Sequence, residues 1–224
     1  MRVAALYDIH GNLPALEAVL AEVDADVVVV GGDFVAGPWP AETLARLRSL
    51  PGDVRFIRGN ADREVYEEGQ GLAPPEVMDF VRARLSPEDV DFLRSLPLTE
   101  TIGRTLFCHA TPRNDEEIFT RDSPEERWRE ALAGVDADIV VCGHTHVQFD
   151  RRIGDVRLVN AGSVGMPYET EPGAYWALVG DDVELRHTAY GPADIGAAGW
   201  PEEWPAATAD EATAFFERMS LERY

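Results

Sequence analysis

The sequence contains no lysine, so all of its positive side-chain charge at neutral pH comes from 20 arginines. Against these stand 41 aspartates and glutamates, which give a formal net charge of −21. An acidic surface repels polyanions, which argues against nucleic-acid polymers and anionic membranes as partners. It does not exclude small phosphate substrates, because bound divalent cations reverse the local field of a site.

Cysteine and long apolar runs are also scarce. Cys108 and Cys142 are the two cysteines of the chain, so no disulfide framework is expected, and both fit small buried strand residues. No apolar run approaches the roughly 20 residues that a membrane span requires. The opening residues reach Asp8 too early to form a signal peptide. We therefore expect a cytoplasmic protein with no membrane partner.

Strand-like and helix-like segments alternate at the start of the chain. Strands are predicted at residues 2–7, 26–30 and 54–57, and helices at residues 13–23 and 41–50. This alternation predicts a parallel sheet. Residues 63–97 break the rhythm, with helix starts at Pro74-Pro75 and Ser86-Pro87. We interpret residues 63–97 as a helical, cap-like insertion that covers the site and is not an independent domain.

The second half begins with more alternation and then changes to short strands. Strands are predicted at 105–108, 139–142, 148–153, 156–160, 174–179 and 183–188, with tight turns at Gly154-Asp155 and Gly180 to Asp182. A helix is predicted at 123–132, beginning at Ser123. Residues 192–224 form a C-terminal extension, a loop over 192–205 and then a helix over 210–219 capped by Asp210. We expect one domain over residues 1–224.

Polar side chains of three kinds follow the predicted parallel strands. They are Asp8 and His10, Asp33, Asn60, His109, and His144 with His146. The carboxyl ends of such strands share one edge of a sheet, so these side chains should converge. The chain has five histidines, and His187 alone lies outside this set. We interpret His187 as a surface or structural residue.

The chemistry of this set predicts a metal centre. Carboxylate, amide oxygen and imidazole ligate hard-to-borderline dications, which makes Mn²⁺ the first expectation and Fe, Zn, Ni or Mg the alternatives. The set has seven ligands, too many for one catalytic metal and suited to two divalent ions with a carboxylate between them. Two ions about 4 Å apart generate hydroxide at neutral pH and clamp a phosphoryl group for in-line attack.

The same residues resemble a known family. Asp8-x-His10, Gly32-Asp33, Gly59-Asn60, His109 and Gly143-His144-x-His146 are similar to the five blocks of the calcineurin-like metallophosphoesterases, in particular the small YfcE-like phosphodiesterases. The resemblance spans residues 1 to about 188 and implies a four-layer α/β/β/α sandwich with a small helical insertion.

The resemblance also implies a division of the ligands. Asp8, His10 and His146 would hold the first metal, and Asn60, His109 and His144 the second. Asp33 would bridge the two metals. Asp33, Asn60 and His109 thereby become catalytic candidates, whereas Gly162 and Ser163 would support the metal loop.

One block departs from the family pattern. Most members have histidine after the asparagine, where it assists the leaving group, whereas this chain has Asn60-Ala61-Asp62. General acid catalysis contributes about 10² to 10⁴ in rate, so its loss should penalise poor leaving groups most. Asp62 or Arg63 could replace the histidine, or Asp62 could orient the loop.

Two further features concern the substrate. Arg58 and Arg113 lie near the motif loops and are candidate phosphate contacts, although each equally fits a surface residue. Phe34 to Pro38 follow Asp33 where protein Ser/Thr phosphatases and diadenosine tetraphosphatases carry Asp-Arg-Gly, which argues against both assignments.

The leading hypothesis is therefore a metal-dependent phosphoesterase. We expect a phosphodiesterase that hydrolyses a small organic phosphate through in-line attack of a metal-bridging hydroxide. The alternative is a non-catalytic metal-binding or interaction scaffold of the same fold, like the retromer small subunit, which has lost key metal-site residues. The substrate, the preference for monoesters or diesters, the metal and a homo-oligomeric state stay open.

Overall fold

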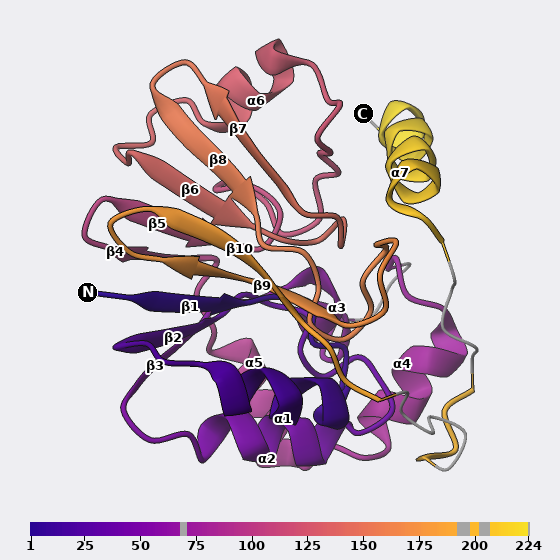
Figure 1. Cartoon of the computed structure of the whole chain (residues 1–224). Helices are drawn as coiled ribbons and strands as arrows, with labels where there is room; N and C mark the ends of the chain where they lie inside the picture. The colour runs from indigo at the N-terminus through magenta and orange to yellow at the C-terminus, as the bar shows by residue number, and fades with distance from the viewer. Residues whose placement is uncertain (68–70, 192–197, 202–206, 224) are drawn as a thin grey trace.

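Two five-stranded sheets packed face to face form the centre of the molecule (Figure 1). The computed structural model describes residues 1–67, 71–191, 198–201 and 207–223. The first sheet contains β1 (Val3–Leu6), β2 (Val27–Val30), β3 (Asp53–Phe56), β9 (Ala174–Val179) and β10 (Val183–Thr188). The second contains β4 (Thr99–Ile102), β5 (Thr105–Cys108), β6 (Ile139–Cys142), β7 (Phe149–Ile153) and β8 (Val156–Asn160).

Each sheet is mixed: three neighbouring strands are parallel, and two further strands are added through antiparallel pairs. The order in the first sheet is β10-β9-β1-β2-β3, in which β1, β2 and β3 are parallel. The order in the second is β4-β5-β6-β8-β7, in which β5, β6 and β8 are parallel. Residues Gly154-Asp155 join β7 to β8, and Gly180 to Asp182 join β9 to β10, as expected.

Strand β1 shows why the sheets are buried on both faces. Side chains alternate along a strand, so Val3, Ala5 and Tyr7 pack against Phe107 and Val141 of the second sheet. Ala4 and Leu6 of the same strand pack instead into the core beneath the helices. A strand covered on both faces is a continuous apolar run, and this one is.

Helices complete the four layers. Figure 1 shows α1 (Leu13–Glu22), α2 (Pro40–Arg48) and α5 (Pro87–Arg94) on the outer side of the first sheet, and α6 (Glu125–Ala131) on that of the second. The short helix α3 (Asn60–Glu64) follows β3, and α4 (Pro75–Arg82) lies beyond it. Helix α7 (Ala209–Arg223) is the last element. The predicted four-layer α/β/β/α sandwich is confirmed.

The described part of segment 63–97 contains α4 and α5, and its predicted helix starts are confirmed. Proline occupies the first turn of α4 and α5, where its missing N–H costs no hydrogen bond, and Ser86 caps α5. Val77 and Val81 of α4 and Leu93 of α5 join the core that α1 and α2 share. This segment therefore contributes to the main core. The division into one domain with a cap-like insertion stays a prediction.

One strand was missed, and two predicted helix caps need correction. Strand β4 was not expected, and it pairs antiparallel with β5 at the edge of the second sheet. Ser123 does not cap α6, because its hydroxyl is bonded to Glu217 of α7. Thr208 rather than Asp210 caps α7: its hydroxyl accepts the Glu211 N–H, and the Glu211 carboxylate accepts the Thr208 N–H.

Part of the C-terminal extension falls outside the described residues. The loop expected over 192–205 is described only at residues 198–201. Among the described residues, no helix has both the length and the apolar character needed to cross a bilayer.

Candidate metal centre

The seven predicted ligands converge at the carboxyl ends of the parallel strands. Asp8 and His10 follow β1, Asp33 follows β2, Asn60 opens α3 after β3, His109 follows β5, and His144 and His146 follow β6. Each of these side chains belongs to a residue that is no more than 7% exposed. Buried ionisable groups are costly unless paired or bound to a metal, so this concentration indicates a functional site.

The ligand atoms form two groups. Asp8, His10 and His146 make one group, and Asp33, His109 and His144 make the other, each with its ligand atoms within 4.8 Å of one another. Asn60 adjoins the second group, since its Oδ1 lies 3.2 Å from His109 Nε2. The first group contains the three residues expected at the first metal, and the second contains Asp33 together with two of the three residues expected at the second metal. The assignment of ligands to the two metals stays a prediction. The bridging role of Asp33 stays a prediction.

Backbone carbonyls orient three of the imidazoles. His10 Nδ1 lies 3.1 Å from the Ala36 carbonyl, His109 Nδ1 3.0 Å from that of Gly31, and His146 Nδ1 2.7 Å from that of Met166. A carbonyl oxygen only accepts, so each Nδ1 carries the hydrogen. In its neutral form each ring then presents an unprotonated Nε2, which is the form a metal requires.

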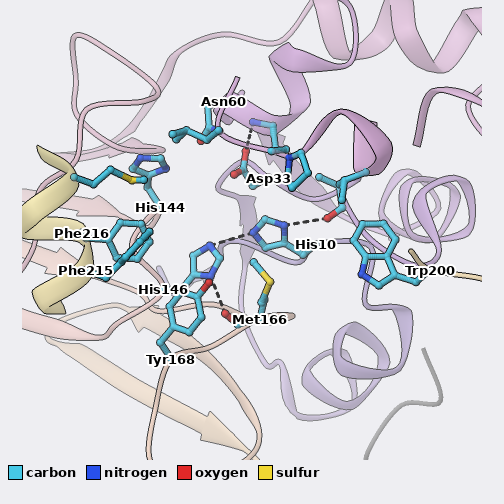
Figure 2. A pocket seen from close by; sticks show the side chains of 17 residues that line it. His10, Asp33, Asn60, His144, His146, Met166, Tyr168, Trp200, Phe215 and Phe216 are labelled. Atoms are coloured by element: carbon cyan, nitrogen blue, oxygen red, sulfur yellow. Dashed lines mark hydrogen bonds between the residues drawn. The ribbon is translucent and has the colours of Figure 1, made fainter. Parts of the chain in front are cut away.

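Several polar atoms of the two ligand groups lack a suitable hydrogen-bond partner, which fits bound cations. His10 Nε2 lies 3.1 Å from His146 Nε2, although in the neutral rings both atoms are acceptors (Figure 2). Asp8 Oδ1 and His144 Nε2 are buried without any hydrogen-bond partner. Buried polar atoms rarely remain unpaired in native proteins. A divalent cation in each group would satisfy the donor atoms that the protein leaves unpaired.

The backbone at these ligands is held in an uncommon conformation. The described non-glycine residues with positive φ are Asp8, His10, Asp33, His144 and His146, with φ between 47° and 69°. Every one of them is a predicted ligand. The left-handed region costs such residues on the order of 1–3 kcal/mol each and persists only where the surrounding structure imposes it. The fold therefore tolerates an unfavourable backbone conformation that orients these side chains toward one another.

Asp62 holds the loop that carries Asp33. Its fully buried carboxylate accepts the backbone N–H groups of Asp33, Phe34, Val35 and Gly59. Burial, with the charge of Asp33 next, raises the pKa of Asp62 to about 7. Asp33 Oδ1 in turn accepts the Ala61 N–H at 2.8 Å. These contacts favour the loop-orienting interpretation of Asp62.

Glycine allows two of the close approaches in the centre. A Cβ on Gly59 would lie 2.1 Å from Asp33 Oδ1, and one on Gly143 would lie 2.4 Å from Asp8 Oδ2. Both distances are far inside van der Waals contact. The Gly-Asn and Gly-His pairs of the sequence therefore have a steric cause, because a larger residue would displace a ligand carboxylate.

The charges within the second group are unequal. Burial opposes ionisation of Asp33, but His109 and the neighbouring histidines hold its pKa well below the usual range. Burial also lowers the pKa of His109, and the carboxylates of Asp33 and Asp8 outweigh it to give about 10. Burial and His109 lower the pKa of His144 to about 4. Asp33 is thus anionic and His144 neutral near pH 7, as ligands should be, whereas His109 would have to release its Nε2 proton to a bound cation.

Residues outside the ligand set hold it in place. Ser163 Oγ donates to the Asp8 carbonyl at 2.7 Å and accepts the Met166 N–H, so it supports the metal loop as expected. Glu64 Oε1 accepts from Asn60 Nδ2 at 3.2 Å, which turns Asn60 Oδ1 toward His109. Sequence reasoning missed Glu64, although its position four residues after Asn60 on a helix was a usable signal.

The two candidate phosphate contacts are engaged elsewhere. Arg58 Nε donates to Asp115 at 2.8 Å, and the same carboxylate pairs with Arg63. Arg113 is bonded to Glu117 at 2.7 Å on the surface. Substrate contact by Arg58 or Arg113 stays a prediction.

The histidine and the cysteines outside the ligand set have structural surroundings. His187 is exposed in β10, with Nε2 3.1 Å from the Pro172 carbonyl. Cys108 and Cys142 are buried, unpaired strand residues. Their expected roles are confirmed.

A cavity of about 280 Å³ opens onto the metal centre. Figure 2 shows His10, Asp33, Asn60, His144 and His146 on its walls, together with aromatic side chains from distant parts of the sequence. Tyr168 and Trp200 come from loops, and Phe215 and Phe216 from α7. Sequence reasoning identified the candidate ligands on one wall and missed the aromatic residues of the other.

Comparisons with known proteins agree with this geometry. The calcineurin-like phosphoesterase superfamily domain matches residues 1–181. The chain therefore belongs to the calcineurin-like phosphoesterase superfamily, which confirms the expected metal-dependent phosphoesterase function. Phosphodiesterase YfcE of Escherichia coli strain K12 is 26% identical over 193 residues, covering 81% of this chain and 89% of that protein.

Other similarities extend over the whole fold or over half of the chain. A metallophosphoesterase from Sphaerobacter thermophilus superposes with a TM-score of 0.76 at 24% identity, covering 97% of this chain and 98% of that one. A hypothetical protein from Pyrococcus horikoshii OT3 superposes with a TM-score of 0.77 at 21% identity, covering 96% of this chain and 97% of that one. A symmetrical bis(5'-nucleosyl)-tetraphosphatase from Janthinobacterium sp. (strain Marseille) is 30% identical over 119 residues, 49% of this chain and 43% of that protein.

Proposed function

We propose that the chain is a dinuclear metal-dependent phosphodiesterase that hydrolyses a small organic phosphate in the cytoplasm. The observation that carries the proposal is the pair of buried ligand groups with their unpaired Asp8 Oδ1 and His144 Nε2. The similarity to phosphodiesterase YfcE supports a diester substrate. Free buried Cys108 and Cys142 suit a reducing compartment, which supports the location.

The roles proposed for the residues combine the two ligand groups with the division that the family resemblance implies. Two divalent cations, Mn²⁺ by our expectation, would polarise the phosphoryl oxygens and activate water for in-line attack. Asp8, His10 and His146 would hold one cation, and Asn60, His109 and His144 the other. Asp33 would lie between them, in the position that Asp62 fixes through the loop backbone. Arg58 and Arg113 are kept as candidate substrate contacts.

The scaffold alternative is not favoured, because no predicted ligand is missing from the two groups or their border. A scaffold would need neither the unpaired donor atoms nor the left-handed backbone at the ligands. Elemental analysis separates the enzyme from a metal-free interaction scaffold, and the activity test separates it from a metal-binding scaffold. About two metal ions per chain after Mn²⁺ loading would support the enzyme. A metal-free chain would support the scaffold.

The activity test uses the full chain loaded with Mn²⁺. We expect hydrolysis of bis(p-nitrophenyl) phosphate, with slower hydrolysis of p-nitrophenyl phosphate. Asp33→Asn should abolish both activities, whereas His187→Gln, a substitution at the exposed histidine of β10, should leave both unchanged. Metal-loaded protein that is inert toward monoesters and diesters would overturn the proposal.

A further inference from the structure

The walls of the cavity differ sharply in chemistry. One wall is formed by the metal ligands, and the remaining surface is mostly apolar, with Met166, Tyr168, Trp200, Phe215, Phe216 and Met219. Figure 2 shows Phe215 and Phe216 at one side and Trp200 at the opposite side, with His10 and His146 between them. A group attached to a phosphate at the metals would therefore meet aromatic surface.

The aromatic wall begins directly at a ligand. The Tyr168 ring stacks on His146, with centroids 5.1 Å apart and planes 16° from parallel. Phe216 follows, with its ring centroid 6.1 Å from that of Tyr168. An aromatic ring carried on an ester oxygen of the phosphate would continue this row of rings from His146 through Tyr168 to Phe216. Aromatic pairs at such separations attract each other more strongly than the burial of their apolar area alone would give.

Cationic side chains are missing from this surface. Within the described part of the chain, no arginine lines the cavity, and the sequence holds no lysine. A substrate with several phosphates would have to place its extra negative charge beside apolar side chains, which is costly. The cavity suits one phosphate with a single charge, and that is the charge of a phosphodiester.

The wall from α7 is fixed to the body of the protein. The Glu217 carboxylate accepts hydrogen bonds from the hydroxyls of Thr120 and Ser123, and Asp210 forms an ion pair with Arg121. Thr120 and Ser123 are both buried. These contacts hold the face of α7 that carries Phe215 and Phe216 over the metal centre.

From these observations we propose that the cavity selects phosphodiesters with an aromatic ester group, which lies against Tyr168 and the α7 phenylalanines. The inference rests on the proposed phosphodiesterase function and narrows its substrate class. Phe215 and Phe216 then determine specificity, because they contact the ester group.

The test measures binding apart from turnover. Diphenyl, dicyclohexyl and dimethyl phosphate have poor leaving groups and serve as slow-reacting ligands for the Mn²⁺-loaded full chain in isothermal titration calorimetry. We expect diphenyl phosphate to bind at least about tenfold more tightly than dimethyl phosphate, with dicyclohexyl phosphate between them. Phe216→Ala should reduce the preference for diphenyl over dimethyl phosphate by about tenfold.

Two further variants complete the test. Phe215→Ala is the second probe of the wall, and since Phe215 is 50% exposed its truncation should not prevent folding. Leu221→Ala is the matched control, because Leu221 is on the same helix and 79% exposed. The control should keep the wild-type preference.

Each negative result contradicts a different part of the proposal. Equal binding of diphenyl and dimethyl phosphate, or a preference that survives both phenylalanine variants, would overturn the inference. Dicyclohexyl phosphate that binds as tightly as diphenyl phosphate would overturn the assignment of an aromatic group. Tight, ring-selective binding in a protein that hydrolyses no ester would contradict the proposed function alone.

Discussion

The carboxylate of Asp8 accepts the backbone N–H of His144 at 2.8 Å. Asp8 follows β1 of the first sheet, and His144 follows β6 of the second. The two residues belong to different ligand groups. One side chain is thus a candidate ligand in one group and a positioning residue for the other, so the two metal sites should not be independent.

This relationship predicts unequal effects of two ligand substitutions. His10→Ala removes a donor from the first group only and should leave about one metal ion per chain. Asp8→Ala also removes the acceptor that positions His144, so it should lower the occupancy of both sites. Mass spectrometry of Mn²⁺-loaded, desalted protein measures the ratio, with His187→Ala as the control. Identical metal content in the Asp8 and His10 variants would contradict the coupling.

Metal removal should lower the thermal stability. The cations would neutralise the buried carboxylates and bind the unpaired donor atoms of the folded chain. In the unfolded chain water solvates these groups, so the metal stabilises the folded state. Free metal at 100 times its Kd contributes about 2.7 kcal/mol to the folded state. For a chain of this size that corresponds to a rise in Tm of roughly 5–10 °C. Calorimetry before and after chelation checks it.

The control for this measurement is the same titration on the His144→Ala variant, which should gain less stability from Mn²⁺. A Tm that does not respond to chelation in the wild-type chain would show that these groups hold no metal under the conditions used.

Asp62 should act through metal binding. An asparagine there offers one carbonyl oxygen to four N–H groups, so Asp62→Asn should loosen the loop around Asp33. Substitutions of residues that orient metal ligands typically weaken metal affinity by about 10–100-fold. We expect activity to fall and then recover at high Mn²⁺ concentration. A proton-donor role predicts unchanged metal affinity and the greatest loss with poor leaving groups.

Ala61 provides a gain-of-function prediction. Ala61 lines the cavity next to Asn60. The family resemblance implies a histidine at this position that assists the leaving group. General acid catalysis contributes about 10² to 10⁴ in rate. Ala61→His should therefore raise kcat for alkyl esters far more than for p-nitrophenyl esters. The readout is the slope of log(kcat/KM) against leaving-group pKa, which should flatten. Ala61→Gln, similar in size but unable to titrate near pH 7, should keep the original slope.

The parallel strands and the convergence of the candidate ligands could be predicted from the sequence because both leave local marks. Apolar runs such as Val27–Val30 end at glycine and then at a polar ligand, and the carboxyl ends of parallel strands must share an edge. The carbonyls of Ala36, Gly31 and Met166 that orient the histidines left no mark, since every residue has a carbonyl.

Two other features depend on tertiary contacts. Strand β4 is short and half polar, and it becomes a strand only because β5 offers it an edge. Helix α7 has little amphipathic character, so its sequence does not single out one face for packing. Its position is decided by the contacts of Glu217 with Thr120 and Ser123, almost a hundred residues earlier. No periodicity in the sequence encodes such a pairing.

The separation of α7 from the predicted ligands in the sequence has an evolutionary consequence. The predicted ligands all lie between Asp8 and His146, under steric constraints that leave little room for substitution. Phe215 and Phe216 belong to neither ligand group and lie on a helix that carries no predicted ligand. Substitutions in α7 should therefore redirect substrate choice in a descendant protein while its hydrolytic chemistry is inherited intact.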